Sequence, residues 1–208
     1  MFRLQEAHMN TKMTTQTERT SKTAERGKTY DMAYIAVFAV LMAICSWISI
    51  PTVIPFTLQT FAVFLAVIVL GGKRGTMSVI VFVLLGAVGV PVFSGFTGGP
   101  HIIMGNTGGY IIGFILAALL MWLMERLFGR KTWVLAVSML LGMVTYYVFG
   151  TIWFMVVYMR TTGPVGVTAV LGWCVIPFII PDLVKAALAL FLGQALRRPL
   201  SAIMGENA

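Results

Sequence analysis

The sequence predicts an all-α integral membrane protein, a bundle of six transmembrane helices. Hydrophobic residues make up 59% of the 208 residues and charged residues only 11%. The apolar residues gather in six long segments, which short polar or glycine-rich stretches separate. Because the hydrocarbon core of a bilayer is about 30 Å thick, one helical span takes roughly 20 apolar residues. A chain of this length therefore holds several spans in one membrane domain and leaves little for a soluble domain.

The chain starts with a polar segment, residues 1–29, which we predict to be a disordered cytoplasmic tail. It is rich in threonine and has no apolar run long enough to bury a core. It also lacks the hydrophobic region of a signal peptide. The six-helix membrane domain is therefore expected over residues 30–198, and a short cytoplasmic C-terminal tail over residues 199–208.

The first half of the membrane domain contains three apolar segments. The first, residues 33–50, ends at the element Ile-Pro-Thr-Val-Ile-Pro, where two prolines remove backbone donors and favour an extended turn. The second, residues 56–70, is short and closes at Gly-Gly-Lys-Arg-Gly, and the third runs over residues 76–93. Each is predicted to be one helical span.

The second half begins after a glycine-rich loop. The fourth segment covers residues 108–124, and the fifth, residues 133–159, is long enough to tilt or to protrude from the bilayer. The sixth, residues 165–196, is too long for one straight span. Because proline favours the first turn of a helix, we expect Pro177 and Pro181 to divide it into an irregular first half and a final helix that starts near Pro181.

The positive charges agree with six spans and two cytoplasmic termini. Lysine and arginine are enriched on the cytoplasmic side of membrane helices. In this topology only Arg160, on the outer side, and Lys185, inside the last segment, fall elsewhere among the 15 lysines and arginines. The cytoplasmic ones are Arg3, Lys12, Arg19, Lys22, Arg26, Lys28, Lys73, Arg74, Arg126, Arg130, Lys131, Arg197 and Arg198.

Two charged residues, Asp182 and Lys185, lie inside the last apolar segment. They are three residues apart, so they share one helical face and can pair. An unpaired charge in the bilayer centre costs on the order of 3 kcal/mol, so such residues face a cavity, a partner or a ligand. The expected first turn of the final helix also offers free N–H groups to an anion. Two interpretations stay open, a structural salt bridge and a ligand-binding site.

The loop before the fourth segment carries two glycine pairs, Gly98-Gly99 and Gly108-Gly109, on the same outer side as Asp182. Glycines allow the main chain to approach a ligand closely. The middle of the loop, Pro-His-Ile-Ile-Met, is apolar, which favours folding back over the bundle. A flexible external turn is the alternative.

Several other classes of function lack their motifs. The chain has no GxxxxGK[ST] sequence for phosphate binding and neither HExxH nor GxSxG, and His101 stands alone in the loop. Cys45 and Cys174 lie in apolar segments without CxxC spacing, as buried small hydrophobes do. The net charge of +8 comes from cations between apolar segments, which indicates membrane topology rather than nucleic-acid binding. We expect no catalytic residues, no metal site and no cofactor.

Four motifs resemble the BioY family, the biotin-binding S-component of energy-coupling factor (ECF) transporters. They are IPFTLQTFAVFLAVIVLGGKRGTMSV, GAVGVPVFSGFTGG, GNTGGYIIGF and IPDLVKA, and the resemblance covers nearly all of residues 34–196 in order. It implies six transmembrane helices that bind biotin from outside under an external loop. It also implies a location in the cell membrane and two partners, a transmembrane coupling subunit and a pair of ATPase subunits.

The resemblance also implies which residues contact the ligand. Asp182 and Lys185 of IPDLVKA match the family's polar contacts, and Thr97 stands where other members have asparagine. Asn106 stands where proline is more usual. Further polar candidates are Gln59 and Tyr110, and possible apolar contacts are Phe93, Phe96, Tyr146 and Trp173.

Biotin asks for three kinds of complement. Its ureido ring has two N–H donors and a carbonyl, its thiophane ring and chain need an apolar wall, and its valerate needs a cation or clustered donors. We expect Asp182 and Thr97 to contact the ureido ring. We expect Lys185 to bond the same ring or to neutralise Asp182, and a contact of Lys185 with the valerate is the alternative.

The first segment carries a stripe of small residues, Ala36, Ala39 and Ala43, that lets a second helix approach closely. Packing inside the bundle is one interpretation. The resemblance favours the other, an interface with the coupling subunit.

Two rival functions remain: an S-component for another vitamin such as thiamine or riboflavin, and an intramembrane enzyme or assembly subunit.

Overall fold

The computed structural model describes residues 29–204, so residues 1–28 of the predicted tail, with its six cations, lie outside the described residues, whereas Thr29 is helical. The chain divides into two compact units, Met1–Tyr34 and Ile35–Ala208. The described residues of the first unit are helical and begin the first helix, Thr29–Trp47. The second unit contains the other helices and the candidate site.

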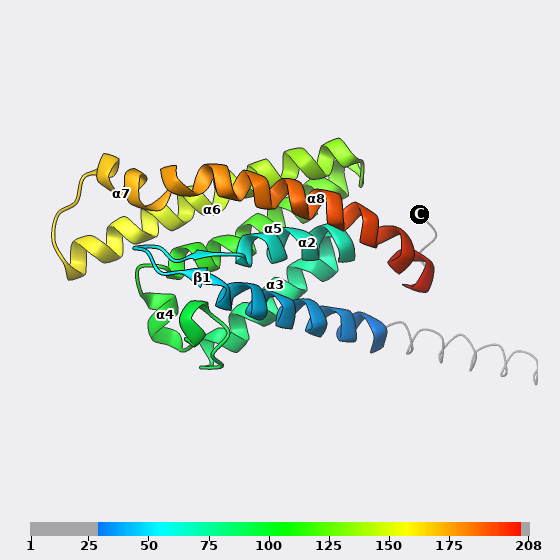
Figure 1. Ribbon diagram of the computed structural model, residues 1–208, viewed down its shortest axis with the longest axis horizontal. Coiled ribbons are helices and arrows are strands. Elements are labelled where there is room, and N and C mark those ends of the chain that lie inside the picture. Colours follow the sequence, from blue (N-terminus) through cyan, green and yellow to red (C-terminus); the bar gives the residue numbers. More distant parts are fainter. Residues whose placement is uncertain (1–28, 205–208) are drawn as a thin grey trace, which may run out of the picture. The chain divides into compact units, whose positions relative to one another are not determined.

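Among the described residues of the second unit, helices predominate and the strands form one short hairpin, which confirms the predicted helical fold class (Figure 1). Its hairpin forms at the two prolines after the first helix, where Ser49 pairs with Thr57. After the first helix the elements are β1 (Ser49–Ile50), β2 (Phe56–Thr57), α2 (Gln59–Leu70), α3 (Gly72–Ala87), η1 (Ser94–Phe96), α4 (Pro100–Met104), α5 (Gly108–Phe128), α6 (Thr132–Thr161), α7 (Val167–Cys174) and α8 (Ile176–Met204).

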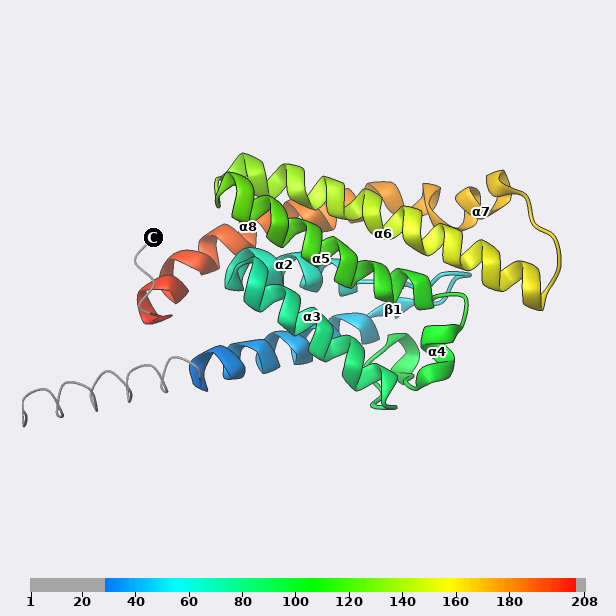
Figure 2. The same ribbon diagram turned by 180° about the vertical axis from the view of Figure 1, so that it is seen from behind.

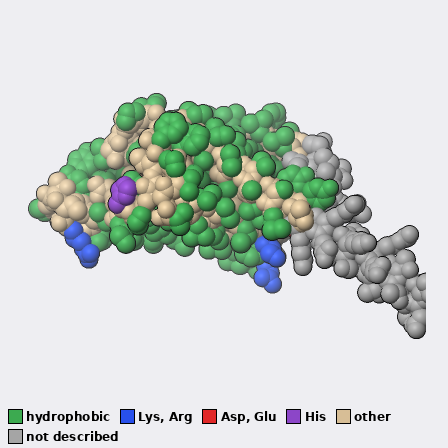
Figure 3. Space-filling view, turned by 90° about the horizontal axis from the view of Figure 1, so that it is seen from below, with side chains coloured by type: hydrophobic (Ala, Val, Ile, Leu, Met, Phe, Trp, Pro, Cys, Tyr) green, Lys and Arg blue, Asp and Glu red, His purple; other side chains and the backbone are tan. Residues whose placement is uncertain are grey.

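Four segments among the described residues are long and apolar enough to cross a membrane: Thr29–Trp47, Gly108–Phe128, Thr132–Thr161 and Val167–Arg197. The surface agrees, since large apolar side chains such as Ile180 and Phe191 are 74% and 73% exposed. The face in Figure 3 is mostly hydrophobic, with lysine or arginine side chains toward its two ends. The chain is therefore a multi-pass membrane protein.

Helix α2 is the interior helix of the second unit. It contacts α8, α3 and α5, and Figures 1 and 2 show it among these helices from both sides. Eleven of its 12 residues are buried. A helix that is apolar all round its circumference belongs in such an interior position. With 12 residues it is shorter than a typical span, as is α3 with 16.

A polar cluster joins the turn between α2 and α3 to the turn between α5 and α6. Gly71 adopts a φ of +86°, a left-handed conformation that favours glycine. The Glu125 carboxylate accepts the Gly72 N–H at 2.8 Å and pairs with Arg130 at 3.3 Å. Arg130 in turn donates to the carbonyl of Ile68 at 2.8 Å. The cluster thus satisfies backbone groups at the end of α2 and the start of α3.

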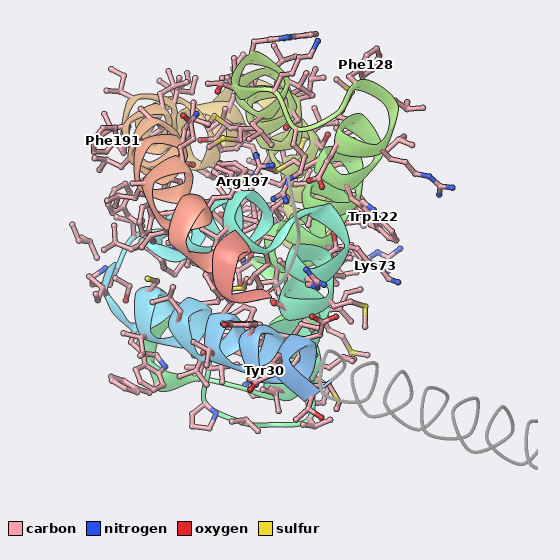
Figure 4. All side chains as sticks on the ribbon, turned by 90° about the vertical axis from the view of Figure 1, so that its right-hand side faces the viewer. Tyr30, Lys73, Trp122, Phe128, Phe191 and Arg197 are labelled. Atoms are coloured by element: carbon pink, nitrogen blue, oxygen red, sulfur yellow. The ribbon has the colours of Figure 1, made fainter. Side chains whose placement is uncertain are left out.

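Helix α8 ends near the same cluster. Arg197 donates to the carbonyl of Arg130 at 3.3 Å. Figure 4 looks at this end and shows Arg197 directed toward the middle of the helices, whereas Lys73 and Phe191 point outward. Basic residues from three separate segments, Lys73, Arg130 and Arg197, therefore lie at one end of the second unit.

The start of the final helix differs from the prediction. α8 begins at Ile176 rather than near Pro181, and Val175 separates it from α7. Pro177 occupies the first turn, where its missing N–H has no helical partner to lose. Pro181 then lies inside the helix and removes one backbone hydrogen bond. The expectation that Asp182 lies in the first turn, beside free N–H groups, is consequently wrong.

Candidate functional site

A cavity of about 210 Å³ lies among the helices of the second unit, beside the N-terminal end of α2. Asp182 and Lys185 line its wall and form a salt bridge with each other. The pair is therefore compatible with both interpretations, a structural salt bridge and a ligand-binding site. Of its other lining residues, those with polar side chains are Thr57, Gln59, Thr60, Ser94, Thr97, Thr107, Tyr110, Tyr146, Tyr147 and Cys174. The apolar ones are Ile54, Pro55, Phe93, Ile102, Ile111, Phe114 and Phe178.

Asp182 is the centre of the polar network and is only 3% exposed. Its Oδ1 accepts from Lys185 at 2.8 Å and from the Thr60 hydroxyl at 3.2 Å. Its Oδ2 accepts from the hydroxyls of Tyr146 and Tyr147, both at 2.7 Å. A carboxylate has about four acceptor positions. All four are occupied, by residues of α2, α6 and α8.

Lys185 has three partners in the same wall. Its ammonium donates to Asp182, and to the main-chain carbonyl of Thr57 at 2.7 Å. It also lies 3.9 Å from the centre of the Phe56 ring, a cation–π contact. The lysine therefore links α8 to the segment just before α2. Its charge is balanced locally, which a buried ammonium requires.

The tyrosines are held by close packing against glycines. Tyr146 lies edge-on to Phe114, with ring centres 5.2 Å apart, and a Cβ at Gly113 would come within 3.0 Å of the Tyr146 backbone. Tyr110, which also lines the cavity, shares a 3.1 Å hydrogen bond with Thr151. A Cβ at Gly150 would overlap the Tyr110 ring. The helical glycines thus make room for the aromatic side chains of the site.

The glycine-rich loop before α5, predicted to be external, contacts the helices. Trp153 of α6 donates to the carbonyl of Gly105 at 3.0 Å. Trp47 of the first helix donates to the carbonyl of Pro91 at 2.9 Å and stacks on Phe96. These contacts hold α4, the apolar centre of the loop, against the helices. The structure therefore favours a loop that folds back over the bundle, rather than a flexible turn.

The loop glycines serve the protein's own packing. Gly99 has a φ of +111°, which favours glycine. A Cβ at Gly98 would overlap the carbonyl of Val90, and one at Gly108 the carbonyl of Ile103. A Cβ at Gly109 would overlap the Trp153 side chain. The close approaches predicted from these glycines are thus made to neighbouring chain segments.

The structure brings together most of the predicted ligand contacts. Of the polar set, Gln59, Thr97, Tyr110, Asp182 and Lys185 all line the cavity, and Asn106 does not, although its neighbour does. Of the apolar set, Phe93 and Tyr146 line it. Phe96 and Trp173 are outside it, 65% and 41% exposed.

The hydroxyl of Thr97, a predicted ligand contact, already has a hydrogen-bond partner within the protein. Its hydroxyl donates to the carbonyl of Ser94 at 2.9 Å within the loop. The single hydroxyl proton is therefore used, and only its oxygen is left to accept from a ligand. The predicted contact between Thr97 and the ureido ring stays a prediction.

Sequence reasoning did not find three groups that hydrogen-bond to the charged pair, nor the polar lining residues Ser94 and Thr107. Thr60 and Tyr147 both donate to Asp182, and the carbonyl of Thr57 accepts from Lys185. The two hydroxyls could have been predicted, since a polar side chain inside an apolar helix needs a partner. The carbonyl of Thr57 could not, because every residue has a main-chain carbonyl and nothing in the sequence distinguishes this one.

The alanine stripe is divided between the interior and the surface. Ala39 and Ala43 are buried, with 2% and 4% of their surface exposed, whereas Ala36 is exposed. Burial at Ala39 and Ala43 favours packing inside the second unit at those two positions.

Among residues 29–204, no group of three histidine, cysteine, aspartate or glutamate side chains could hold a metal ion.

A buried ion pair beside a cavity, within apolar helices, defines a membrane-embedded binding protein. The sequence matches the BioY family over residues 11–202. A Thermotoga maritima protein named "Biotin transporter BioY" is 39% identical over 165 residues, covering 78% of this chain and 92% of the relative. The chain therefore belongs to the BioY family.

Other relatives and a solved structure agree. "Probable biotin transporter BioY" of Pyrococcus horikoshii is 39% identical over 171 residues, covering 82% of this chain and 98% of the relative. "Biotin transporter BioY2" of Lactococcus lactis is 32% identical over 176 residues, covering 84% and 93%. A crystal structure of the S-component for biotin from an ECF-type ABC transporter superposes with a TM-score of 0.73 at 26% identity, covering 82% of this chain and 92% of that one.

Proposed function

We propose that this protein is the biotin-binding S-component of an ECF transporter in the cell membrane. The observation that carries the proposal is the buried Asp182–Lys185 pair in the wall of a cavity under the external loop. The similar proteins named as biotin transporters and the similar biotin S-component structure support the choice of ligand. In this role the chain is a transport component and not an enzyme.

The proposed topology has six spans with both termini in the cytoplasm, and a membrane domain over residues 30–198. Four segments meet the length of a span, and α2 and α3 supply two shorter ones that form a hairpin. Such short spans fit because α2 lies inside protein rather than lipid. The end with Lys73, Arg130 and Arg197 faces the cytoplasm, and the cavity opens toward the outside.

Biotin fits the chemistry of the cavity. The aromatic and aliphatic lining suits the thiophane ring and the valeryl chain. Asp182 supplies an acceptor for an N–H group of the ureido ring once the ligand replaces one of its present donors. We assign Lys185 to neutralising Asp182, because the two charges are already 2.8 Å apart. A contact of Lys185 with the valerate is the alternative.

ATP hydrolysis must come from partners, since the chain has no GxxxxGK[ST] sequence. We propose a transmembrane coupling subunit and an ATPase pair. The exposed Ala36 marks one face of the first helix as a candidate contact with the coupling subunit, within the predicted stripe.

Calorimetry with the detergent-purified protein tests the ligand. We expect wild type to bind biotin, and Asp182→Asn and Lys185→Ala to lose binding while still giving a cooperative thermal transition. Each variant should also lose stability, by about 3–5 kcal/mol if it leaves the other charge buried alone. An Asp182→Asn/Lys185→Met double variant should regain stability without regaining binding.

Two outcomes would contradict the proposal. If biotin gives no heat with folded wild type, the charged pair is a structural bridge. If thiamine or riboflavin competes with biotin and binds more tightly, the protein is an S-component for another vitamin.

A further inference from the structure

The cavity wall contains a buried hydrogen-bond donor that no group among residues 29–204 satisfies. Gln59 is 5% exposed and lines the cavity. Its amide nitrogen, Nε2, is buried and has no hydrogen-bond partner. An unsatisfied buried polar group costs about 1–3 kcal/mol of free energy. A hydrogen-bond acceptor of a ligand beside Nε2 would remove this cost, so binding of such an acceptor is favourable at this position.

Asp182, unlike Gln59, already has all of its hydrogen-bonding positions occupied. Its oxygens already accept from Thr60, Lys185, Tyr146 and Tyr147. A ligand N–H can reach this carboxylate only in exchange for one of these donors. The ligand carbonyl cannot bond a carboxylate at all, because both are acceptors. Recognition of a carbonyl group therefore needs a donor elsewhere in the wall.

Gln59 and Asp182 line the same cavity, and Gln59 lies in the chain segment that contacts the charged pair. Gln59 directly precedes Thr60, whose hydroxyl donates to Asp182 at 3.2 Å. Two residues before Gln59, the carbonyl of Thr57 accepts from Lys185. The chain segment from Thr57 in β2 to Thr60 in the first turn of α2 therefore carries the free amide and two of the groups that bind the charged pair.

We propose that Gln59 is the specificity-determining residue for the ureido group, and that its amide pairs with one edge of that group. Nε2 donates to the ureido carbonyl, and the amide oxygen Oε1 accepts the adjacent N–H. A primary amide and a cyclic urea are complementary in this way, because each presents one N–H and one C=O side by side. The second ureido N–H then faces Asp182. This inference rests on the proposed function, since it names the group of biotin that Gln59 contacts.

The experiment exchanges hydrogen-bonding groups on both sides of this contact. In 2-iminobiotin a guanidinium replaces the ureido group, so the edge carries donors only. A carboxylate pairs with such an edge through two parallel hydrogen bonds. We therefore compare calorimetric Kd values of biotin and 2-iminobiotin for wild type and Gln59→Glu. We expect the ratio of the two Kd values to shift toward 2-iminobiotin by about tenfold or more.

A second variant keeps the test independent of a buried new charge. Gln59→Met has a similar length and no hydrogen-bonding group, and it should weaken biotin binding about tenfold to a hundredfold without lowering the melting temperature. Thr76→Val is the matched control. Thr76 also has a buried side-chain oxygen without a partner, but it lies on α3 and does not line the cavity. Its Kd for biotin should equal that of wild type.

The failures are distinguishable. If wild type binds biotin and Gln59→Met binds it equally well, the role of Gln59 is overturned and the proposed function stands. If both Gln59 variants weaken biotin and 2-iminobiotin by the same factor, the edge pairing is overturned. If folded wild type binds no biotin, the proposed function fails, and the inference fails with it.

Discussion

Tyr146 and Tyr147 are neighbours in sequence that donate to the same oxygen of Asp182. They differ in burial, since Tyr146 is 2% exposed and packed against Phe114, whereas Tyr147 is only partly buried. Tyr146 therefore belongs to the fixed scaffold of the site. Tyr147 is the donor that a ligand N–H can replace with the least disturbance of the packing.

This difference predicts opposite effects of removing the two hydroxyls. Tyr146→Phe should destabilise the protein by about 1.5–3 kcal/mol, because it removes a buried hydrogen bond to a charged group. Tyr147→Phe should tighten biotin binding, by up to about tenfold, because Oδ2 no longer has to exchange a donor. Calorimetric Kd values and detergent melting curves measure both effects. Weaker binding by Tyr147→Phe would mean that its hydroxyl contacts the ligand directly.

Among the helices, the first has two kinds of alanine. Ala39 is buried and Ala36 is exposed, although the stripe in the sequence treats them alike. The difference arises because only some faces of a helix meet other helices of the same chain. A partner subunit can use only the faces that remain exposed.

Tryptophan substitutions separate these two positions. Ala39→Trp should lower the melting temperature, because overpacking a core costs about 1–3 kcal/mol. Ala36→Trp should preserve folding and the Kd for biotin, but reduce ATP-driven uptake in cells that contain the coupling and ATPase subunits. Normal uptake by Ala36→Trp would exclude this position from the interface.

The turn between α2 and α3 depends on a residue of α5. Glu125→Ala should destabilise the protein by about 1–3 kcal/mol, because the Gly72 N–H and Arg130 lose their partner. Arg126→Ala, at an exposed position of the same helix, is the matched control and should have little effect. The Kd for biotin should stay at the wild-type value in both, since α2 separates this cluster from the cavity. A melting temperature equal to that of wild type in Glu125→Ala would show that the cluster contributes no stability.

For the whole molecule, the position of the positive charges predicts the topology. Single cysteines placed at Arg160 and at Lys73, in a Cys45→Ala/Cys174→Ala background, should react differently with a membrane-impermeant maleimide. We expect labelling at position 160 in intact cells, and at position 73 only after permeabilisation. The reverse pattern would invert the proposed orientation. Labelling of both positions in intact cells would contradict the count of six spans.

Much of the architecture follows from local sequence patterns. The apolar segments, their approximate limits and the shared face of Asp182 and Lys185 depend on residue type and helical period, which act over a few residues. The start of α8 was predicted wrongly because proline tolerance inside a helix depends on surrounding packing, which sequence spacing does not contain.

The contents of the site depend on contacts between distant segments. The donors to Asp182 come from residues 122 positions away at Thr60, and 36 and 35 positions away at Tyr146 and Tyr147. Which helix faces meet is settled by the packing of all side chains together. The membrane class and the charged pair can therefore be inferred from the chain alone. The saturation of Asp182, the free amide of Gln59 and the burial of Ala39 exist only in the folded arrangement, because each is a relation between helices.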